Sequence, residues 1–579
     1  MAEAQPNENI RYEPDERPPW LLAGGAGFQA AMIMLAPVIL TVVIVVQIAG
    51  QSAGYLSWAV FAALLISGFT TILQAVRVGR IGAGHVLFMG TSGAFIAVCV
   101  AALVEGGPST MASLVVVSAL FQFLLAARLQ VFRRIFTPVV SGTVIMLIAV
   151  TVMPLVFDAL TQVPEGTSAA AAPIAAVATL ATVAALILRA APKWRLWSPL
   201  IGIVAGCVVA APFGLYDAQP ILDAPWVGVP LDGWPGFDLT PGVEFWALLP
   251  AFIVVTIVGA IETIGDSVAI QQVSRRKPRA TDFRLVQGAL NADGMGNLLS
   301  GLAGTLPNTT YSSSVPLSGV TGIAARRVGV AIGVIFIILA FFPKVAALLI
   351  AIPGPVAAAY ITVLIGVLFV QGMKIIVQDG VDHRTAAIAG LSFWIGVGFQ
   401  NQVIFADQLG DGFIGVFLGN GMTSGALTAI IMMLFMELTS PRRRRLKAAL
   451  DIAALPRIDE FLRAYASKHG WNAASADRLA SAGEETLAIL LQGSQDAAAG
   501  VERQLTVSAR PEGRSVEVEF LTALEGENME DRLAYLSELP PVPDEREVSF
   551  RLLWHYASSV QHQKYHGVDI ITVRVGRTG

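Results

Sequence analysis

The sequence predicts an all-α polytopic membrane protein followed by a soluble α+β domain, and three observations support this fold class. Of the 579 residues, 55% are hydrophobic, and apolar runs long enough to cross a bilayer recur through most of the chain. Lysine and arginine gather in alternate connections between these runs. Charged residues are scarce up to Met436 and frequent after it, which predicts that the chain leaves the membrane there.

Fourteen transmembrane segments are expected between an N-terminal arm and a C-terminal domain. The arm comprises residues 1–20, the transmembrane domain residues 21–437 and the C-terminal domain residues 438–579. The expected segments lie at about 21–48, 55–76, 83–104, 111–127, 136–157, 171–190, 197–213, 245–272, 285–303, 309–322, 328–343, 345–371, 385–398 and 412–437.

The distribution of basic residues orients these segments. Connections such as 275–284 and 442–447 are basic, whereas 49–54, 105–110 and 214–244 contain neither lysine nor arginine. Because basic loops stay on the cytoplasmic side, both termini are expected in the cytoplasm, which an even number of segments requires. The expected location is the inner membrane of the cell.

Two segments break the helical pattern at matching places. The third segment contains LFMGTSGAFIAV (87–98), and the tenth contains PNTTYSSSVPLSGVTG (307–322). Each is third in its half if the chain divides into seven plus seven segments. Gly- and Pro-interrupted segments at corresponding positions are typical of the midplane binding site of a transporter. Close helix packing is the alternative explanation for so many small residues.

The eighth segment carries two carboxylates in an apolar surrounding. Glu262 and Asp266 are four residues apart and therefore share one helix face. A carboxylate near the bilayer centre costs about 2.5–3.5 kcal/mol on the insertion scale, so a functional role is expected for this pair. The structural alternative for Glu262 is to cap a helix end or to pair with Arg326 or Arg275. Asp293, in the ninth segment, has the alternative role of holding that segment against the eighth.

Several motifs together resemble one known family. They are GFQAAMIML (27–35), FMGTSGAFI (88–96), TPVVSGTVIMLIAV (137–150), IETIGDSVAI (261–270), LNADGMGNLLSGLAGTLPNTT (290–310) and IPGPV (352–356). In this order, over roughly residues 10–437, the chain resembles the nucleobase–ascorbate transporter family, which comprises the uracil and xanthine permeases. The resemblance implies two inverted repeats of seven segments, with short strands in segments 3 and 10. It also implies a core domain of segments 1–4 and 8–11, a gate domain of segments 5–7 and 12–14, and a homodimer.

The resemblance also implies a binding site. Glu262 matches the glutamate that hydrogen-bonds the nucleobase, and Phe95 is expected to pack on its ring. Backbone amides near Gly93 and Ala94 and near Ser313 and Ser314 are expected to supply further contacts. Gln29, in the first segment, is also expected to contact the substrate, with Ala30 after it where many xanthine-type members have histidine. Ser313 and Ser314 replace the usual Gln-Asn or Glu-Asn pair, and Pro316 replaces a glycine, so the identity of the base stays open.

Coupling to an ion is expected at Asp266 and Asp293. A buried carboxylate with a like-charged neighbour favours its protonated form, which suits a proton symporter. Sodium is the less favoured alternative, with Asp293, Asn297 and nearby hydroxyls as oxygen ligands. No metal site and no cofactor are expected.

The expected function is therefore secondary transport rather than enzymatic catalysis. The substrate would be a purine such as xanthine or urate, or else uracil, and no nucleic acid is expected to bind. One alternative is a transporter-like sensor that signals through its C-terminal domain. The other is an anion transporter of the sulfate-permease type, against which Glu262 argues.

The C-terminal domain is expected to be an α+β sandwich. Helices are predicted at 477–495 and 548–565, and strands at 503–511, 514–524 and 568–575. The order faintly resembles the ATP-binding fold of histidine kinases and anti-sigma factors. The magnesium-binding asparagine and the Gly-rich loops of that fold are missing, so a regulatory or dimer-contacting role is favoured. The basic run 442–445 is expected to lie near anionic lipid headgroups, or to act only as a stop-transfer flank.

Overall fold

The structure is a computed structural model, and it describes most of the chain. The described part is residues 10–577, except for 130–136, 162, 164–166, 196, 278, 378–381, 406–407, 409–413, 415–417, 420, 440–442, 495–502, 513–514, 523–528, 530–532, 534–544 and 567. It forms two compact units. The smaller unit comprises residues 275–287 and the chain from Glu437 onward, and the larger unit comprises the rest.

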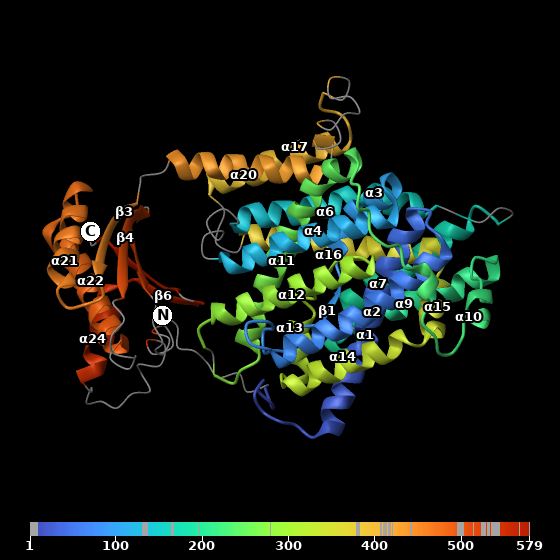
Figure 1. Ribbon diagram of the computed structural model, residues 1–579, viewed down its shortest axis with the longest axis horizontal. Helices are drawn as coiled ribbons and strands as arrows, with labels where there is room; N and C mark the ends of the chain where they lie inside the picture. The colour runs from blue at the N-terminus through green and yellow to red at the C-terminus, as the bar shows by residue number, and fades with distance from the viewer. Residues whose placement is uncertain are drawn as a thin grey trace. The chain divides into compact units, whose positions relative to one another are not determined.

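Helices make up nearly all of the secondary structure before Arg443, and Figure 1 shows the long ones running in broadly similar directions. They are α1 (Trp20–Ile48), α2 (Ala53–Val76), α3 (Ile96–Glu105), α4 (Gly107–Ala127), α6 (Pro138–Ala159), α7 (Ala171–Arg189), α8 (Pro192–Arg195), α9 (Ser198–Ala210), α10 (Gln219–Asp223), α11 (Val243–Val273), α12 (Phe283–Ala303), α13 (Ser314–Thr321), α14 (Arg326–Ala340), α15 (Pro343–Ile350), α16 (Gly354–Val377), α17 (His383–Gln400) and α20 (Gly421–Thr439).

Several of these helices could cross a bilayer. Seven helices of the described chain are long and apolar enough, or eight if α14 and α15, which bend by 84°, form one span. The apolar stretches 93–105, 198–213 and 421–436 are helical but shorter. The structure thus gives a helical protein with several membrane-spanning candidates, and the full number of fourteen segments stays a prediction.

Two short strands interrupt the helices at the third and tenth segments, as expected. Strand β1 (Met89–Thr91) pairs antiparallel with β2 (Asn308–Thr310). A 3₁₀ turn, Gly93–Phe95, leads from β1 into α3, and α13 follows β2. All six strand residues are buried. The pairing lets each strand satisfy backbone groups of the other, which is what non-helical backbone at membrane depth requires.

Glycines bring the backbones of the larger unit into direct contact. A Cβ on Gly142 of α6 would lie 2.5 Å from the carbonyl oxygen of Gly372 in α16. A Cβ on Gly68 of α2 would lie 2.6 Å from the carbonyl oxygen of Gly333 in α14. Because no side chain fits between these helices, dispersion contacts along the backbones stabilise the bundle.

The described part of the N-terminal arm pairs with the connection between α13 and α14. The backbone N–H groups of Arg11 and Tyr12 donate to the Gly322 carbonyl at 2.8 and 3.1 Å, and Ala324 N–H donates to the Tyr12 carbonyl at 2.9 Å. Arg326 forms an ion pair with Asp15 at 2.7 Å. This part of the arm is therefore attached to the larger unit by backbone pairing.

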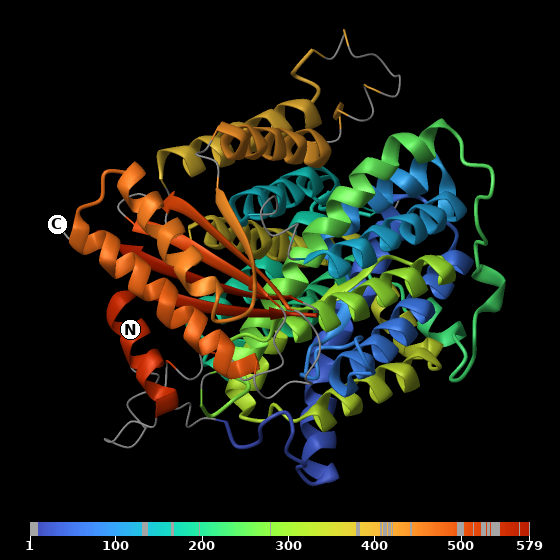
Figure 2. The same cartoon turned by 60° about the vertical axis from the view of Figure 1, so that its left-hand side comes forward.

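The smaller unit contains a five-stranded antiparallel sheet in the order β3-β4-β5-β7-β6. Helices α21, α22 and α24 pack on one face, and Figure 2 shows the orange helices α21 and α22 there. Val516, Val518 and Phe520 alternate along β5 toward this helical layer. The elements are β3 (Arg444–Ala449), α21 (Ala454–Lys468), α22 (Ala473–Ser494), β4 (Gln504–Glu512), β5 (Ser515–Thr522), α24 (Glu545–Tyr556), β6 (Ser559–Tyr565) and β7 (Val568–Gly576).

The predicted helix 548–565 is wrong in its second half. Helix α24 ends at Tyr556, and residues 559–565 form strand β6, paired with β7. The stretch SVQHQKY reads as polar, but its alternate side chains Val560, His562 and Lys564 are buried. Pairing with β7 overrides the weak local preference for a helix.

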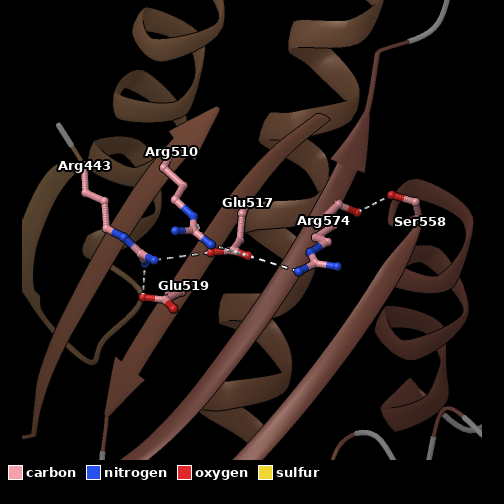
Figure 3. Close-up of polar contacts among 6 residues, drawn as sticks. All are labelled: Arg443, Arg510, Glu517, Glu519, Ser558 and Arg574. Atoms are coloured by element: carbon pink, nitrogen blue, oxygen red, sulfur yellow. Dashed lines mark hydrogen bonds and ion pairs between the residues drawn. The ribbon is translucent and has the colours of Figure 1, made fainter. Parts of the chain in front are cut away.

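The opposite face of the sheet carries a charge network, drawn in Figure 3. Glu517 forms ion pairs with Arg510 at 2.8 Å, with Arg574 at 3.4 Å and with Arg443 at 3.5 Å. Arg443 also pairs with Glu519. The basic run at 442–445 was expected at lipid headgroups. For Arg443 this is wrong, because its side chain is mostly buried in these ion pairs.

Candidate functional site

The carboxylates expected from the sequence lie on two helices beside strand β2. Glu262 and Asp266 are on α11, and Asp293 is on α12. Asp266 and Asp293 are buried, and Glu262 is half-buried. Three acidic side chains this close together in an apolar bundle require hydrogen-bond donors around them.

Two threonines connect Asp266 to Asp293. Thr310 of β2 donates a hydrogen bond to Asp266 Oδ2 at 2.7 Å, and Thr263 of α11 donates to Asp293 Oδ2 at 2.8 Å. The two threonine hydroxyls lie 3.2 Å apart. Both threonines are buried. Strand β2 therefore joins the carboxylates of two different helices through side-chain oxygens.

Gln122 of α4 connects a third helix to this cluster. Its Nε2 donates to Asp293 Oδ2 at 2.5 Å, and its Oε1 accepts from Asn297 Nδ2 at 2.7 Å. Asn297 Oδ1 in turn accepts from the backbone N–H of Asn308 at 2.7 Å. A backbone N–H can only donate, so it determines the orientation of Asn297 and, through Asn297, that of Gln122. The nitrogen of Gln122 must therefore face Asp293.

Arg326 is not the partner of Glu262. Its guanidinium pairs with Asp15 and donates to the Gly84 carbonyl at 2.8 Å, near the connection that precedes β1. Glu262 has no ion pair with Arg326, which leaves its carboxylate for another role. Arg326 instead connects the arm, α14 and the chain before β1.

Phe95 lies against α11 one helical turn before Glu262. Its Cε2 is 3.9 Å from the position that a Cβ on Gly259 would occupy, and its ring centroid lies 6.1 Å from that of Phe252. Phe95 is buried, and its backbone N–H donates to Ser92 O at 3.2 Å within the 3₁₀ turn. Gly93 and Ala94 precede it in this turn. The ring of Phe95 therefore lies close to the backbone of α11 at Gly259.

The other predicted contact residues have structural roles or lie apart. Ser314 is buried; its hydroxyl accepts from Phe88 N–H at 2.9 Å and donates to the Tyr311 carbonyl at 2.6 Å. The backbone N–H of Ser314 is also used, donating to Tyr311 O at 2.9 Å. Ser313 Oγ lies 3.3 Å from Met34 Sδ. Gln29 is on the exposed side of α1 and is not part of the hydrogen-bonded cluster.

Sequence reasoning missed Gln122, Thr263 and Thr310. Gln122 was detectable as a polar residue within the apolar run 114–127, and Thr310 as part of the tenth segment. Thr263 lies between the two carboxylates of α11 and points with Asp266 toward β2. Among the described residues, no group of three or more His, Cys, Asp and Glu side chains is arranged to hold a metal ion.

A small apolar void lies between α11, α6 and α20. Its volume is about 20 Å³. Ile261, the neighbour of Glu262, and Val258 contribute from α11. Val140 and Val144 contribute from α6, and Ala426 and Ile430 from α20. This void has room for little more than one water molecule, so α11 and its neighbours are packed closely here.

Comparison with known proteins gives consistent results. Residues 24–404 match the model of the xanthine/uracil type described as "Permease family". Xanthine permease XanP of Escherichia coli K12 is 28% identical over 75% of this chain and 95% of its own length. Nucleobase transporter PlUacP of Paenibacillus larvae is 28% identical over 70% of this chain and 92% of its own length.

A solved structure gives a weaker match. The transmembrane domain of a cyanobacterium bicarbonate transporter, BicA, aligns with 73% of this chain and 100% of its own, with a TM-score of 0.42 and 14% identity. A likeness at this level does not bear on mechanism. The match to the family model confirms the resemblance inferred from the motifs.

Proposed function

Because this chain belongs to the xanthine and uracil permease family, we propose that it is a secondary transporter that imports a nucleobase together with a proton. The observation that supports this most directly is the position of Glu262. It is a half-buried carboxylate without a basic partner at Arg326, one turn from an aromatic ring and beside the paired strands.

Glu262 is the proposed acceptor for the base. A nucleobase presents adjacent N–H groups along a flat edge, and a carboxylate accepts two of them with charge-assisted hydrogen bonds. Phe95 packs on the ring face, a contact worth about 1–3 kcal/mol in comparable base-stacking sites. Gly93 and Ala94 lie in the turn before Phe95 and supply backbone contacts. Xanthine, urate and uracil all carry the N–H groups that this arrangement needs.

The proton is favoured over sodium by the groups around Asp293. Gln122 presents a nitrogen to this carboxylate, and the Thr263 hydroxyl takes a further position beside it through a hydrogen bond. A sodium ion requires several oxygen ligands directed at one point. The amide orientation set by Asn308 turns the oxygen of Gln122 away from Asp293. Asp266 and Asp293 are therefore the proposed coupling groups, with a proton as the coupling ion.

The proposed architecture is the fourteen-segment inverted repeat of the family. Corresponding pairs of helices support it: α1 packs on α14 as α11 packs on α4, and α16 packs on α7 as α17 packs on α6. In this arrangement α11 belongs to the core domain and α6 and α20 to the gate domain. The contact between α11 and these two helices, which leaves only this small void, is then the interface that opens for transport. Both termini in the cytoplasm, an inner-membrane location and a homodimer complete the proposal.

The smaller unit is proposed to lie in the cytoplasm and to serve regulation or dimer contact. Glu485 of α22 would stand near the acidic position of an ATP-binding fold. Burial raises the pKa of Glu485, while a hydrogen bond from Ser549 of α24 opposes that shift. A carboxylate turned toward α24 in this way contacts a neighbouring helix rather than a bound magnesium ion.

Uptake by cells that produce the protein tests the proposal. Cells with the wild-type chain should accumulate radiolabelled xanthine, urate or uracil, and a proton ionophore should abolish the accumulation. Glu262→Gln replaces a charge-assisted hydrogen bond with a neutral one, so affinity should fall about 10- to 150-fold. Glu244→Gln, an exposed position in the first turn of α11, is the matched control.

Three results would contradict the assignment. Unchanged binding and transport in Glu262→Gln would show that another group reads the base. Binding of a base without its accumulation would identify a sensor instead of a transporter. Accumulation of an inorganic anion in place of every base would favour the sulfate-permease alternative.

A further inference from the structure

We propose that Asp266, Thr310, Thr263 and Asp293 form a proton wire that holds one shared proton between its two carboxylates. The proposal rests on the proposed proton-coupled transport and extends it to the route that the proton takes. Its basis is the number of hydrogen atoms that the observed contacts require. Neither threonine is assigned a role by the resemblance to the family.

The wire contains three links between four side chains. They are Asp266 to Thr310 at 2.7 Å, Thr310 to Thr263 at 3.2 Å and Thr263 to Asp293 at 2.8 Å. Each link needs one hydrogen atom between two oxygens. The two hydroxyls supply only two hydrogens, because each threonine has one O–H donor. A third hydrogen, bound to one of the carboxyl groups, completes the wire.

With one added proton the wire has two complete arrangements. In the first, Asp293 O–H donates to Thr263, Thr263 donates to Thr310, and Thr310 donates to the Asp266 carboxylate. In the second, every hydrogen moves to the other oxygen of its link, so that Asp266 carries the proton and Asp293 is ionised. The interconversion breaks three O–H bonds and forms three, and no charge or atom is gained or lost. The heavy atoms keep their positions.

The ionised end has two donors in either arrangement. Asp293 accepts from Gln122 as well as from Thr263. Asp266 accepts from Thr310 and is also within reach of the Ser312 hydroxyl. Asp293 Oδ1, however, is buried without a partner among the described residues. A buried oxygen without a hydrogen-bond donor costs more free energy on an ionised carboxylate than on a neutral carboxyl group. This conformation therefore places the proton on Asp293.

The other titratable groups of this region explain how the wire responds to substrate. Glu262, on α11, and Tyr311, which follows Thr310 in the chain, are the other titratable side chains here, and the Tyr311 hydroxyl donates to the Thr91 carbonyl at 2.9 Å. Glu262 is one helical turn from Asp266, so its negative charge opposes ionisation of Asp266. A base that donates to Glu262 disperses this charge and thereby favours the arrangement with Asp266 ionised. The base at Glu262 and the proton at Asp293 are then bound at the same time, which is the requirement for symport.

Thr263→Val tests the wire, because valine has nearly the shape of threonine and no hydroxyl. In proteoliposomes, uptake of the transported base driven by a pH gradient is compared with exchange of labelled for unlabelled base, which needs no net proton movement. The ratio of driven uptake to exchange should fall about tenfold or more, the factor that corresponds to one buried polar group left without its partner. Thr263→Ser keeps the hydroxyl and should restore the ratio.

Thr70→Val is the matched control. Thr70 is buried in α2, and its hydroxyl donates to Ile66 O of its own helix at 2.7 Å. Its substitution should leave the ratio at the wild-type value. A wild-type ratio in Thr263→Val would overturn the proposal. So would an equal fall in Thr70→Val, because any loss of a buried hydroxyl would then have the same effect.

A second measurement requires no substrate and separates failure of the wire from failure of the proposed function. Infrared spectra of the purified full chain near neutral pH should contain the carbonyl band of a protonated carboxyl group. Asp266→Asn, Asp293→Asn and Thr263→Val should each change this band, and Thr70→Val should not. If no base is transported but the band behaves in this way, the transport proposal fails and the wire stands. A band that Thr263→Val leaves unchanged would overturn the wire.

Discussion

Gln122 offers the sharpest test of how the buried polar cluster is stabilised. Its amide donates to Asp293 and accepts from Asn297. Gln122→Leu keeps the approximate size of the side chain and removes both interactions, so little cavity cost is added. The change isolates the hydrogen bonds that join α4 to α12.

The expected magnitude follows from the two groups that lose a partner. Each buried donor or acceptor left unsatisfied costs about 1–3 kcal/mol, so the free energy of unfolding should fall by about 2–6 kcal/mol. This is a large share of the roughly 5–15 kcal/mol that stabilises a typical folded domain. The hydrogen bond between Thr263 and Asp293 is kept, which argues for the lower half of that range.

Thermal unfolding of the detergent-purified full chain measures the effect. Gln122→Leu should lower the Tm clearly more than Ser118→Ala. Ser118 lies one turn earlier on α4 and is buried, and its hydroxyl donates to Val115 O in its own helix. The double variant Gln122→Leu with Asn297→Leu should lose less stability than the sum of the single changes, because both partners of one bond are then apolar.

The reasoning would be refuted by two results. The first is a Tm for Gln122→Leu equal to that of Ser118→Ala. The second is strict additivity in the double variant, which would mean that Gln122 and Asn297 do not interact.

Three further predictions concern other parts of the chain. Gly372→Leu should abolish transport and lower the yield of folded protein, because a Cβ there would lie 2.7 Å from the Gly142 carbonyl oxygen. Uptake assays and size-exclusion profiles check this. The control is Gly366→Leu, because a Cβ at Gly366 meets nothing within 4 Å. Glu517→Leu should destabilise the smaller unit by about 1.5–3 kcal/mol, because Arg443 loses one of its two carboxylate partners and keeps Glu519. Hydrogen exchange of β4 and β5 should rise, and unchanged protection would count against it. Glu485→Gln should stabilise the smaller unit at pH 7 and have little effect near pH 4. The raised pKa of Glu485 means that its contribution to stability is full below the unfolded-state pKa and is lost as the pH rises through the folded-state pKa; equal effects at both pH values in hydrogen exchange of α22 would contradict this.

Much of the larger unit was predictable because its signals are local. The apolar runs indicate helices through their length, and Pro, Gly, Ser and Thr mark the third and tenth segments where the strands occur. Glu262 and Asp266 stood out because a carboxylate in an apolar run is costly. The family followed from several motifs in a fixed order and was confirmed by the match over residues 24–404.

The roles of the serines and of Gln122 were not predictable in this way. Ser313 and Ser314 were expected to contact a ligand, yet the Ser314 hydroxyl is used between Phe88 and Tyr311. Gln122 is 171 residues from Asp293 in the chain, and nothing in an apolar helix of even composition indicates which face meets which neighbour. The second half of the predicted helix 548–565 became strand β6 because it pairs antiparallel with the adjoining strand β7, a pairing that the polar composition of SVQHQKY does not indicate.

The sequence by itself determined the class of protein, the two breaks in the helical pattern and the residues whose burial needs an explanation, because length, hydropathy and the cost of a buried charge act within a single segment. The tertiary structure alone decided which groups satisfy those charges. Hydrogen bonds between α4, α11, α12 and β2 depend on distances between segments far apart in the chain. The number of hydrogen atoms needed along Asp266, Thr310, Thr263 and Asp293 therefore depends on the tertiary structure, which brings these four side chains together.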